Sequence, residues 1–222
     1  MCLFNLRQSK LVRRVVCAVM AVVLLAGVGS MCTASAHTDY HVGDVVLFGS
    51  YEQNNIKADG AEAIEWLVLD VRADRMLLLS RYALDSERYH YRKESVNWDT
   101  CSVRGWLNDT FLYDAFTQLE RSWILSSDTS KYADYVFLLS DEEVELYLPR
   151  AKDRICYATE YGSNQNVYVN PSTGGSWWLL RTTGNDGGMF AMSVNSDGAI
   201  DYNGGHVESD RGTVRPAVWV AI

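Results

Sequence analysis

Short apolar segments separated by turn residues are the feature that most limits how this chain can fold. Residues 64–71 and 76–80 are apolar and flank a polar stretch at 72–75, which is the pattern of a β-hairpin. Residues 45–51 precede them and predict a further strand. No obvious linker divides the chain beyond this point, so we expect a single domain over 45–222 after a short polar lead at 37–44.

Helical spacing is confined to short stretches in the middle of the chain. Val103, Leu107 and Phe111 recur every four residues and predict a helix that begins near position 102. Residues 117–120 (TQLE) and 140–143 (SDEE) have the spacing of a capping box, so two more short helices are expected. A strand is expected just before the second of these, because apolar residues dominate the segment that precedes it.

Beyond Tyr157 the helical periodicity is lost, and glycine, asparagine, serine and threonine become frequent. Four short strands are expected there, at 177–181, 190–194, 199–202 and 214–222. Asn-Ser-Asp-Gly at 195–198 is a strong turn signal, because Asp-Gly readily supplies the positive φ angles of a tight hairpin. Strands and short helices in separate runs indicate an α+β fold.

The first thirty-six residues have the layout of a secretory signal peptide. Four basic residues precede an apolar run at 15–29, and Ala-Ser-Ala at 34–36 suits a signal peptidase. The alternative is an uncleaved N-terminal anchor, which would be the chain's one association with a membrane. Either way, the sequence predicts a secreted or cell-surface protein.

Removal of residues 1–36 makes the chain strongly acidic, with 16 basic against 28 acidic residues and a net charge of −12. Such a surface repels phosphate backbones, so nucleic acid is not an expected partner. Only Cys101 and Cys156 remain, and they could form one disulfide or stay as two buried thiols.

Several motifs in a fixed order resemble a family of bacterial secreted proteins that is known only as a domain of unknown function. They read EWLVLD with MLLLSRYAL, NWDTCSVRGWLNDTFLYDAF with LERSWI, DYVFLLSDEEV, WWLLRTTG, VNSDGAI and VRPAVWV. The resemblance covers about residues 45–222.

A looser resemblance extends to the C-type-lectin-like fold of the formylglycine-generating-enzyme kind, through GGSWWLLR and the closing VRPA segment. It implies that both segments lie in the core of the fold. Enzymes of that group bind copper through a cysteine pair in the C-terminal region, and this chain has no cysteine after Cys156. The resemblance therefore favours the fold over the oxidase chemistry.

The WWLLR segment suggests either a core strand or a ligand platform. Side chains alternate along a strand, so Trp177 and Trp178 face opposite ways. One of them is expected in the core, and Trp178 could form the floor of a sugar-binding site, since an indole stacks well on a sugar ring.

Three arginines lie within apolar stretches: Arg104, Arg181 and Arg215. An unpaired buried charge is costly, so each is expected to pair with a carboxylate or with loop carbonyls as part of a polar core. Nearby candidates for the carboxylates are Asp186, Asp197, Asp201 and Asp210. Anion recognition is the alternative role for these arginines.

Acidic and amide side chains in the glycine-rich loops are the remaining binding candidates: Asn185, Asp186, Asn195 and Asp197. They could bind a glycan or a calcium ion, since calcium prefers hard oxygen ligands. The same residue types are common in plain turns, so no cofactor is required.

Catalytic signatures are missing from the sequence. There is no G-x-S-x-G or H-E-x-x-H motif, and His90 and His206 stand alone in polar loops, where solvated histidines are expected. We therefore expect a non-catalytic recognition or adhesion domain that binds a glycan or a surface protein through its C-terminal loops. The alternatives are an enzyme, either a degenerate relative of the formylglycine-generating group or a hydrolase, and a structural envelope protein without a small ligand.

Overall fold

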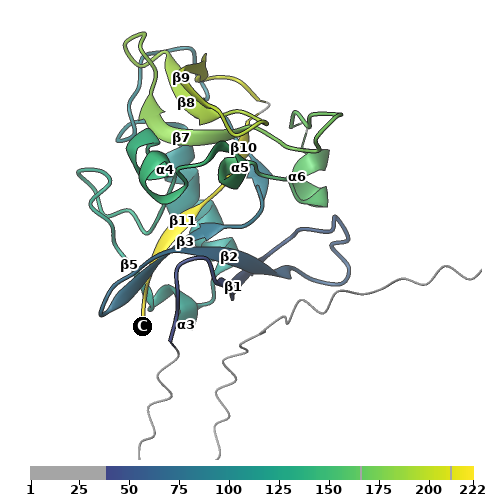
Figure 1. Ribbon diagram of the computed structural model, residues 1–222, viewed down its shortest axis with the longest axis vertical. Coiled ribbons are helices and arrows are strands. Elements are labelled where there is room, and N and C mark those ends of the chain that lie inside the picture. The colour runs from purple at the N-terminus through teal and green to yellow at the C-terminus, as the bar shows by residue number, and fades with distance from the viewer. Residues whose placement is uncertain (1–38, 166, 211) are drawn as a thin grey trace, which may run out of the picture. The chain divides into compact units, whose positions relative to one another are not determined.

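The protein has a mixed α+β fold in a computed structural model that describes residues 39–165, 167–210 and 212–222 (Figure 1). The expected signal peptide at 1–36 lies outside the described residues. Among the residues that are described, no helix is both long and apolar enough to cross a bilayer.

The first sheet contains the predicted hairpin and is antiparallel throughout. Its strands are β1 (Val45–Tyr51), β2 (Glu62–Val71), β3 (Arg75–Ser80), β5 (Ile124–Leu125), β6 (Val136–Phe137) and β11 (Ala217–Ala221). They lie in the order β1-β2-β3-β11-β5, and β6 also pairs with β11. Ile64, Trp66 and Val68 alternate along β2 and are completely buried, as expected for the inward face of a strand.

The second sheet is built from the C-terminal third of the chain together with one short earlier strand. Its strands are β4 (Asp85–Ser86), β7 (Trp178–Thr183), β8 (Phe190–Val194), β9 (Ile200–His206) and β10 (Thr213–Val214). The order is β4-β10-β7-β8-β9, with β10 parallel to β7 and the other pairs antiparallel. The predicted turn at 195–198 joins β8 to β9, and Gly198 has the positive φ angle, 85°, that such a turn uses.

The C-terminal segment belongs to both sheets. The sequence predicts one strand at 214–222, but the structure has two, β10 and β11, because Pro216 has no N–H to donate to a sheet. Arg215 and Pro216 both bond to Ser80 at the end of β3: Arg215 Nε donates to the Ser80 carbonyl at 2.9 Å, and Ser80 N donates to the Pro216 carbonyl at 2.9 Å. Figure 1 shows β11 in yellow running from the second sheet into the first.

Short helices cover the sheets. They are α1 (Ser102–Trp106), the π-helical η1 (Leu107–Phe111), α2 (Leu112–Ala115), α3 (Gln118–Arg121), α4 (Asp141–Tyr147), α5 (Ala151–Arg154) and α6 (Glu160–Asn164). The first three form one continuous helical segment, as the spacing predicts. Both predicted capping boxes are present at the starts of α3 and α4. The sequence did not predict α6, which is a single turn capped by the Thr159 side chain and is too short to show a period.

Candidate functional site

A surface groove of about 300 Å³ lies between the β7–β8 connection and the loop that leads into α1. We call it the loop groove. Its lining residues are Ser95, Val96, Asn97, Thr100, Thr183, Gly184, Gly187 and Gly188. Two segments more than 80 positions apart in the sequence therefore build one surface feature, at the end of the strand that carries the WWLLR motif.

Backbone contacts hold the two walls of the loop groove together. Val96 N donates to the Gly188 carbonyl at 3.0 Å, and the Ser95 hydroxyl donates to the Gly187 carbonyl. Gly188 has a φ angle of 92°, and a side chain there would collide with the carbonyl oxygen of Val96. Only glycine allows the two backbones to approach so closely.

The lining of the loop groove is polar and uncharged. Hydroxyl, carboxamide and backbone groups can donate and accept hydrogen bonds, and none of the eight lining residues has a side chain that titrates near neutral pH. The groove can therefore donate hydrogen bonds to a ligand and accept them from it.

Two of the predicted ligand-binding residues lie next to the loop groove. Asn185 and Asp186 are exposed on the β7–β8 connection, between the lining residues Gly184 and Gly187, but they do not line the groove themselves. The Asn185 amide donates instead to the Asn203 side chain on β9 at 3.3 Å. The sequence thus indicates a loop beside the groove but not the groups that line it.

The other two predicted loop residues lie at the far end of β8. Asn195 and Asp197 belong to the β8–β9 turn, where the Asp197 carboxylate accepts the Ala199 N–H at 3.0 Å and the Asn195 carbonyl accepts the Gly198 N–H at 2.9 Å. Five strand residues of about 3.3 Å each separate this turn from the loop groove. The structure does not bring the four predicted residues together.

The prediction that Trp178 forms a ligand platform is wrong. Its side chain is fully buried, and its indole N–H donates to the Arg154 carbonyl at 3.0 Å. The Arg215 guanidinium lies 5.0 Å from the centre of the ring. Trp177 faces the opposite side of the strand and is partly buried against Gly212. Strand alternation does separate the two tryptophans, but the one that we expected to be accessible is in the core.

Arg181 is paired, but not with any of the carboxylates that we considered. Its guanidinium forms a two-pronged contact with Glu143, including Nη2 to Oε1 at 3.0 Å, and Nη1 also donates to the Leu138 carbonyl. Glu143 is the residue that completes the capping box of α4. One carboxylate therefore both caps a helix and joins it to β7.

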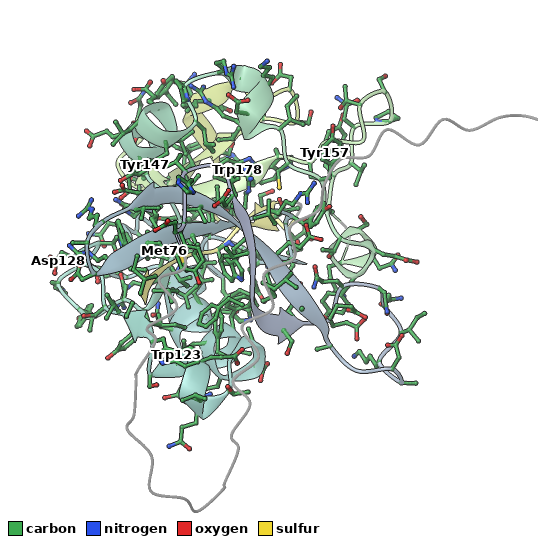
Figure 2. All side chains as sticks on the ribbon, turned by 60° about the horizontal axis from the view of Figure 1, so that its bottom comes forward. Met76, Trp123, Asp128, Tyr147, Tyr157 and Trp178 are labelled. Carbon is green, nitrogen blue, oxygen red and sulfur yellow. The ribbon has the colours of Figure 1, made fainter. Side chains whose placement is uncertain are left out.

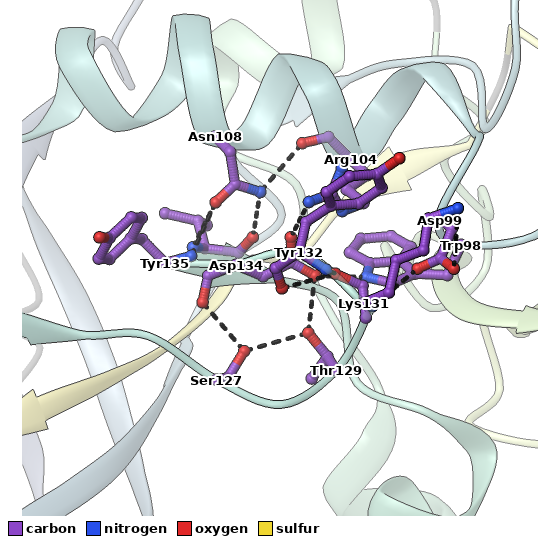
Figure 3. A network of polar contacts seen from close by, with 12 residues as sticks. Trp98, Asp99, Arg104, Asn108, Ser127, Thr129, Lys131, Tyr132, Asp134 and Tyr135 are labelled. Atoms are coloured by element: carbon purple, nitrogen blue, oxygen red, sulfur yellow. Dashed lines mark hydrogen bonds and ion pairs between the residues drawn. The ribbon is translucent and has the colours of Figure 1, made fainter.

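Arg104 pairs with Asp134, a fully buried aspartate, at 2.6 Å. The other carboxylate oxygen of Asp134 accepts hydrogen bonds from the Trp98 indole and from the Thr129 hydroxyl, both at 2.8 Å. Tyr132 covers the guanidinium, with its ring centre 4.6 Å away. Figure 3 shows these side chains between the helix that carries Arg104 and the loop that carries Thr129. The polar-core role predicted for Arg104 fits this network.

Arg215 differs from the prediction, because no carboxylate among the described residues pairs with it. It is 3% exposed, Nε donates to the Ser80 carbonyl, and Nη1 has no partner. Burial lowers the pKa of its guanidinium. The face of Trp178 provides part of the compensation through a cation–π contact.

Cys101 and Cys156 are buried free thiols, so the disulfide between them that the sequence left open is not formed. Cys101 directly precedes α1, and its thiol donates to the Trp98 carbonyl. Cys156 lies opposite Ser176 in an isolated bridge near β7. Burial raises the pKa of the Cys101 thiol to about 12 and also raises that of Cys156.

The acidic loops use their carboxylates within their own turns. Asp201 accepts the N–H groups of Asn203 and Gly204, both at 3.1 Å, in the same way that Asp197 accepts that of Ala199. In the part of the chain that the structure describes, no group of three histidine, cysteine, aspartate or glutamate side chains could hold a metal ion.

Sequence reasoning missed two polar clusters. Asp85 is 8% exposed and accepts the Tyr51 hydroxyl at 2.5 Å and the Ser86 N–H at 2.7 Å, and burial raises its pKa. The sequence feature that could have indicated this cluster is the position of Asp85 directly after the apolar residues 82–84.

The second cluster surrounds His90. This residue was expected to be solvated, but its side chain is only 12% exposed, and both ring nitrogens have partners.

These features define an α+β domain of two sheets joined by the C-terminal segment, with an uncharged groove at one loop cluster. Residues 73–222 match the family described as Domain of unknown function (DUF6273), and the chain belongs to that family. The matched region begins in the β2–β3 turn. Of the two strands before it, β2 pairs with β3 in the matched region, and β1 pairs with β2. No curated protein and no solved structure gives a significant match.

Proposed function

We propose that this protein is a recognition domain that binds a neutral, hydroxyl-rich ligand, such as a cell-surface glycan, in the loop groove. The observation that carries the proposal is the lining of that groove: hydroxyl, carboxamide and backbone groups, with no side chain that titrates near neutral pH. A glycan presents closely spaced hydroxyl groups that both donate and accept, so it is the natural complement of such a lining.

The charge of the chain supports a neutral ligand. The full sequence carries 28 acidic and 20 basic residues, a net charge of −8, which disfavours nucleic acids and other polyanions. The signal-peptide pattern at 1–36 supports a location outside the cytoplasm, where surface glycans occur. On the basis of the charge and the signal-peptide pattern, the proposed role is that of an exported bacterial adhesion or recognition module.

We also propose that the fold is related to the C-type-lectin-like fold of the formylglycine-generating-enzyme kind. The support is the central position of the two segments that carry the resemblance: Trp178 on β7 is fully buried, and Arg215 between β10 and β11 packs against it. An experimental structure compared strand by strand with that fold is the test. A different strand order in the second sheet would contradict the relationship.

The functional test is a binding screen against neutral oligosaccharides and cell-wall fragments, followed by a pair of matched glycine variants. Gly187 and Gly60 both have positive φ angles, 62° and 89°, and a Cβ atom at either position meets nothing within 4 Å. Gly187→Asn adds a side chain at the rim of the loop groove, whereas Gly60→Asn adds the same side chain in the β1–β2 connection. Asparagine tolerates positive φ better than most residues, so both variants should fold.

We expect Gly187→Asn to weaken binding about tenfold or more, as the loss of one or two hydrogen bonds implies, and Gly60→Asn to bind like the wild type. Equal binding by all three proteins would remove the loop groove from the site. No binding by the wild type to any neutral glycan would remove the proposed ligand class.

A further inference from the structure

His90 contacts a serine and a glutamate through its two ring nitrogens, as in a hydrolytic triad but with the roles of the two nitrogens exchanged. Ser102 Oγ lies 2.9 Å from His90 Nδ1, and His90 Nε2 lies 2.9 Å from Glu94 Oε1. Both separations are hydrogen-bond distances, and such a triad is recognised by its geometry rather than by the order of its residues in the chain. The three residues come from the loop before α1 and from the first residue of α1 itself.

Hydrogen bonds fix the backbone at His90 and at the preceding residue, Tyr89. His90 N donates to the Val207 carbonyl at 2.8 Å, and the Tyr89 carbonyl accepts the N–H of Val103 at 3.2 Å. The His90 side chain is 12% exposed, whereas that of Glu94 is 52% exposed. The ring is therefore held by its surroundings, as a base must be if it is to act on one particular hydroxyl group.

The hydrogen-bond pattern selects the tautomer of His90. An ionised glutamate can only accept, so Nε2 carries the hydrogen and donates to Glu94. Nδ1 then has a free lone pair that faces Ser102 Oγ and accepts its hydrogen. In this tautomer Nδ1 can act as the general base that removes the proton from the serine, whereas Nε2 does so in the usual triad.

We propose that Ser102, His90 and Glu94 form a catalytic site that hydrolyses small carboxylic esters, an activity separate from ligand binding in the loop groove. Ser102 Oγ attacks the carbonyl carbon while its proton moves to His90 Nδ1, and Glu94 stabilises the resulting imidazolium. When the ester C–O bond breaks, His90 returns the proton to the leaving alkoxide, and an acyl-serine remains. Water then attacks the acyl group, gives one proton to His90, and releases the acid and Ser102, which regains that proton.

Two backbone N–H groups lie at Ser102. The Ser102 N–H makes no hydrogen bond to another group in the described part of the chain, and in the proposed reaction it donates to the oxygen that becomes negative. The Tyr91 N–H donates to Ser102 Oγ at 3.3 Å and helps to hold the hydroxyl group in place. Acetyl esters are small members of the proposed substrate class and serve in the test. Ser102 and His90 are the catalytic residues, and Glu94 is a positioning residue.

The test combines a fluorophosphonate probe, which reacts covalently with activated serines, with hydrolysis of p-nitrophenyl acetate by the full chain. We expect one labelled peptide, which contains Ser102, and ester hydrolysis above buffer. Ser102→Ala should abolish both. Ser130→Ala is the matched control, because Ser130 is also a partly exposed serine with local hydrogen bonds but no histidine partner, and it should behave like the wild type.

Glu94→Gln separates a positioning role from a purely structural one. The amide can no longer select the Nε2–H tautomer, so kcat should fall at least about a hundredfold while KM changes little. A merely structural contact would shift the melting temperature and leave the kcat of any remaining hydrolysis unchanged. Absence of labelling at Ser102, or hydrolysis by Ser102→Ala equal to that of the wild type, would overturn the proposal.

Discussion

Replacing Trp178 with phenylalanine tests whether this indole stabilises the core, as its buried position and its contacts with Arg154 and Arg215 imply. The Nε1–H bond to the Arg154 carbonyl is lost, and a buried carbonyl without a partner costs about 1 to 3 kcal/mol. The smaller ring also leaves a void beside Arg215, which adds about 1 kcal/mol. Together the free energy of unfolding should fall by about 2 to 4 kcal/mol.

Trp123→Phe is the matched control for this substitution. Trp123 is 38% exposed, and Figure 2 labels it together with Trp178. Surface substitutions usually change stability by no more than about 0.5 kcal/mol, so this variant should unfold almost like the wild type. Urea unfolding followed by far-UV circular dichroism avoids the change in tryptophan fluorescence, and Trp178→Phe should lower the midpoint by about 1 to 2 M. Equal and small losses in both variants would refute the buried position of Trp178.

Buried and partly buried side chains give three further predictions. Burial raises the pKa of Asp85 above its ordinary 3.8, so its contribution to stability is present below that value and is lost as the pH rises through the raised pKa. The stability of Asp85→Asn relative to wild type should therefore improve between pH 4 and pH 7, and a difference independent of pH would contradict this. Arg181→Met should lower the free energy of unfolding by about 1 to 3 kcal/mol, less than the loss of a fully buried pair, because the side chains of Arg181 and Glu143 are 17% and 27% exposed. Additive effects of Arg181→Met and Glu143→Gln in a double-mutant cycle would argue against the pairing. The thiols of Cys101 and Cys156 should react with Ellman's reagent only after the protein unfolds, because both are buried. Rapid reaction of these two thiols in the folded protein would contradict their burial.

The sequence predicted the parts of the fold that depend on local signals. The hairpin of β2 and β3, the turn at 195–198 and the capping boxes of α3 and α4 each depend on residues close together in the chain. Pairing across long sequence separations was not predictable in the same way. β10 lies beside β7 in parallel, and Arg215 and Pro216 separate it from β11, whereas the sequence suggests a single C-terminal strand.

The site predictions were wrong mainly where the hydrogen-bond partner of a residue lies far from it in the sequence. The expectation that Arg181 needs a carboxylate was confirmed, but the partner is Glu143, 38 positions earlier and on a helix, rather than a nearby loop aspartate. His90 was treated as isolated because its serine partner is twelve positions away across a loop. Trp178 could not be distinguished from Trp177 by alternation alone, since alternation separates two faces without saying which one is buried.

Amide chemical-shift changes on titration with a neutral oligosaccharide would locate the bound ligand, which we propose lies in the loop groove. We expect the largest shifts at Ser95–Thr100 and Thr183–Gly188, with little change in the β8–β9 turn at 195–198. Shifts centred on that turn or on another surface, with none at the groove, would contradict it.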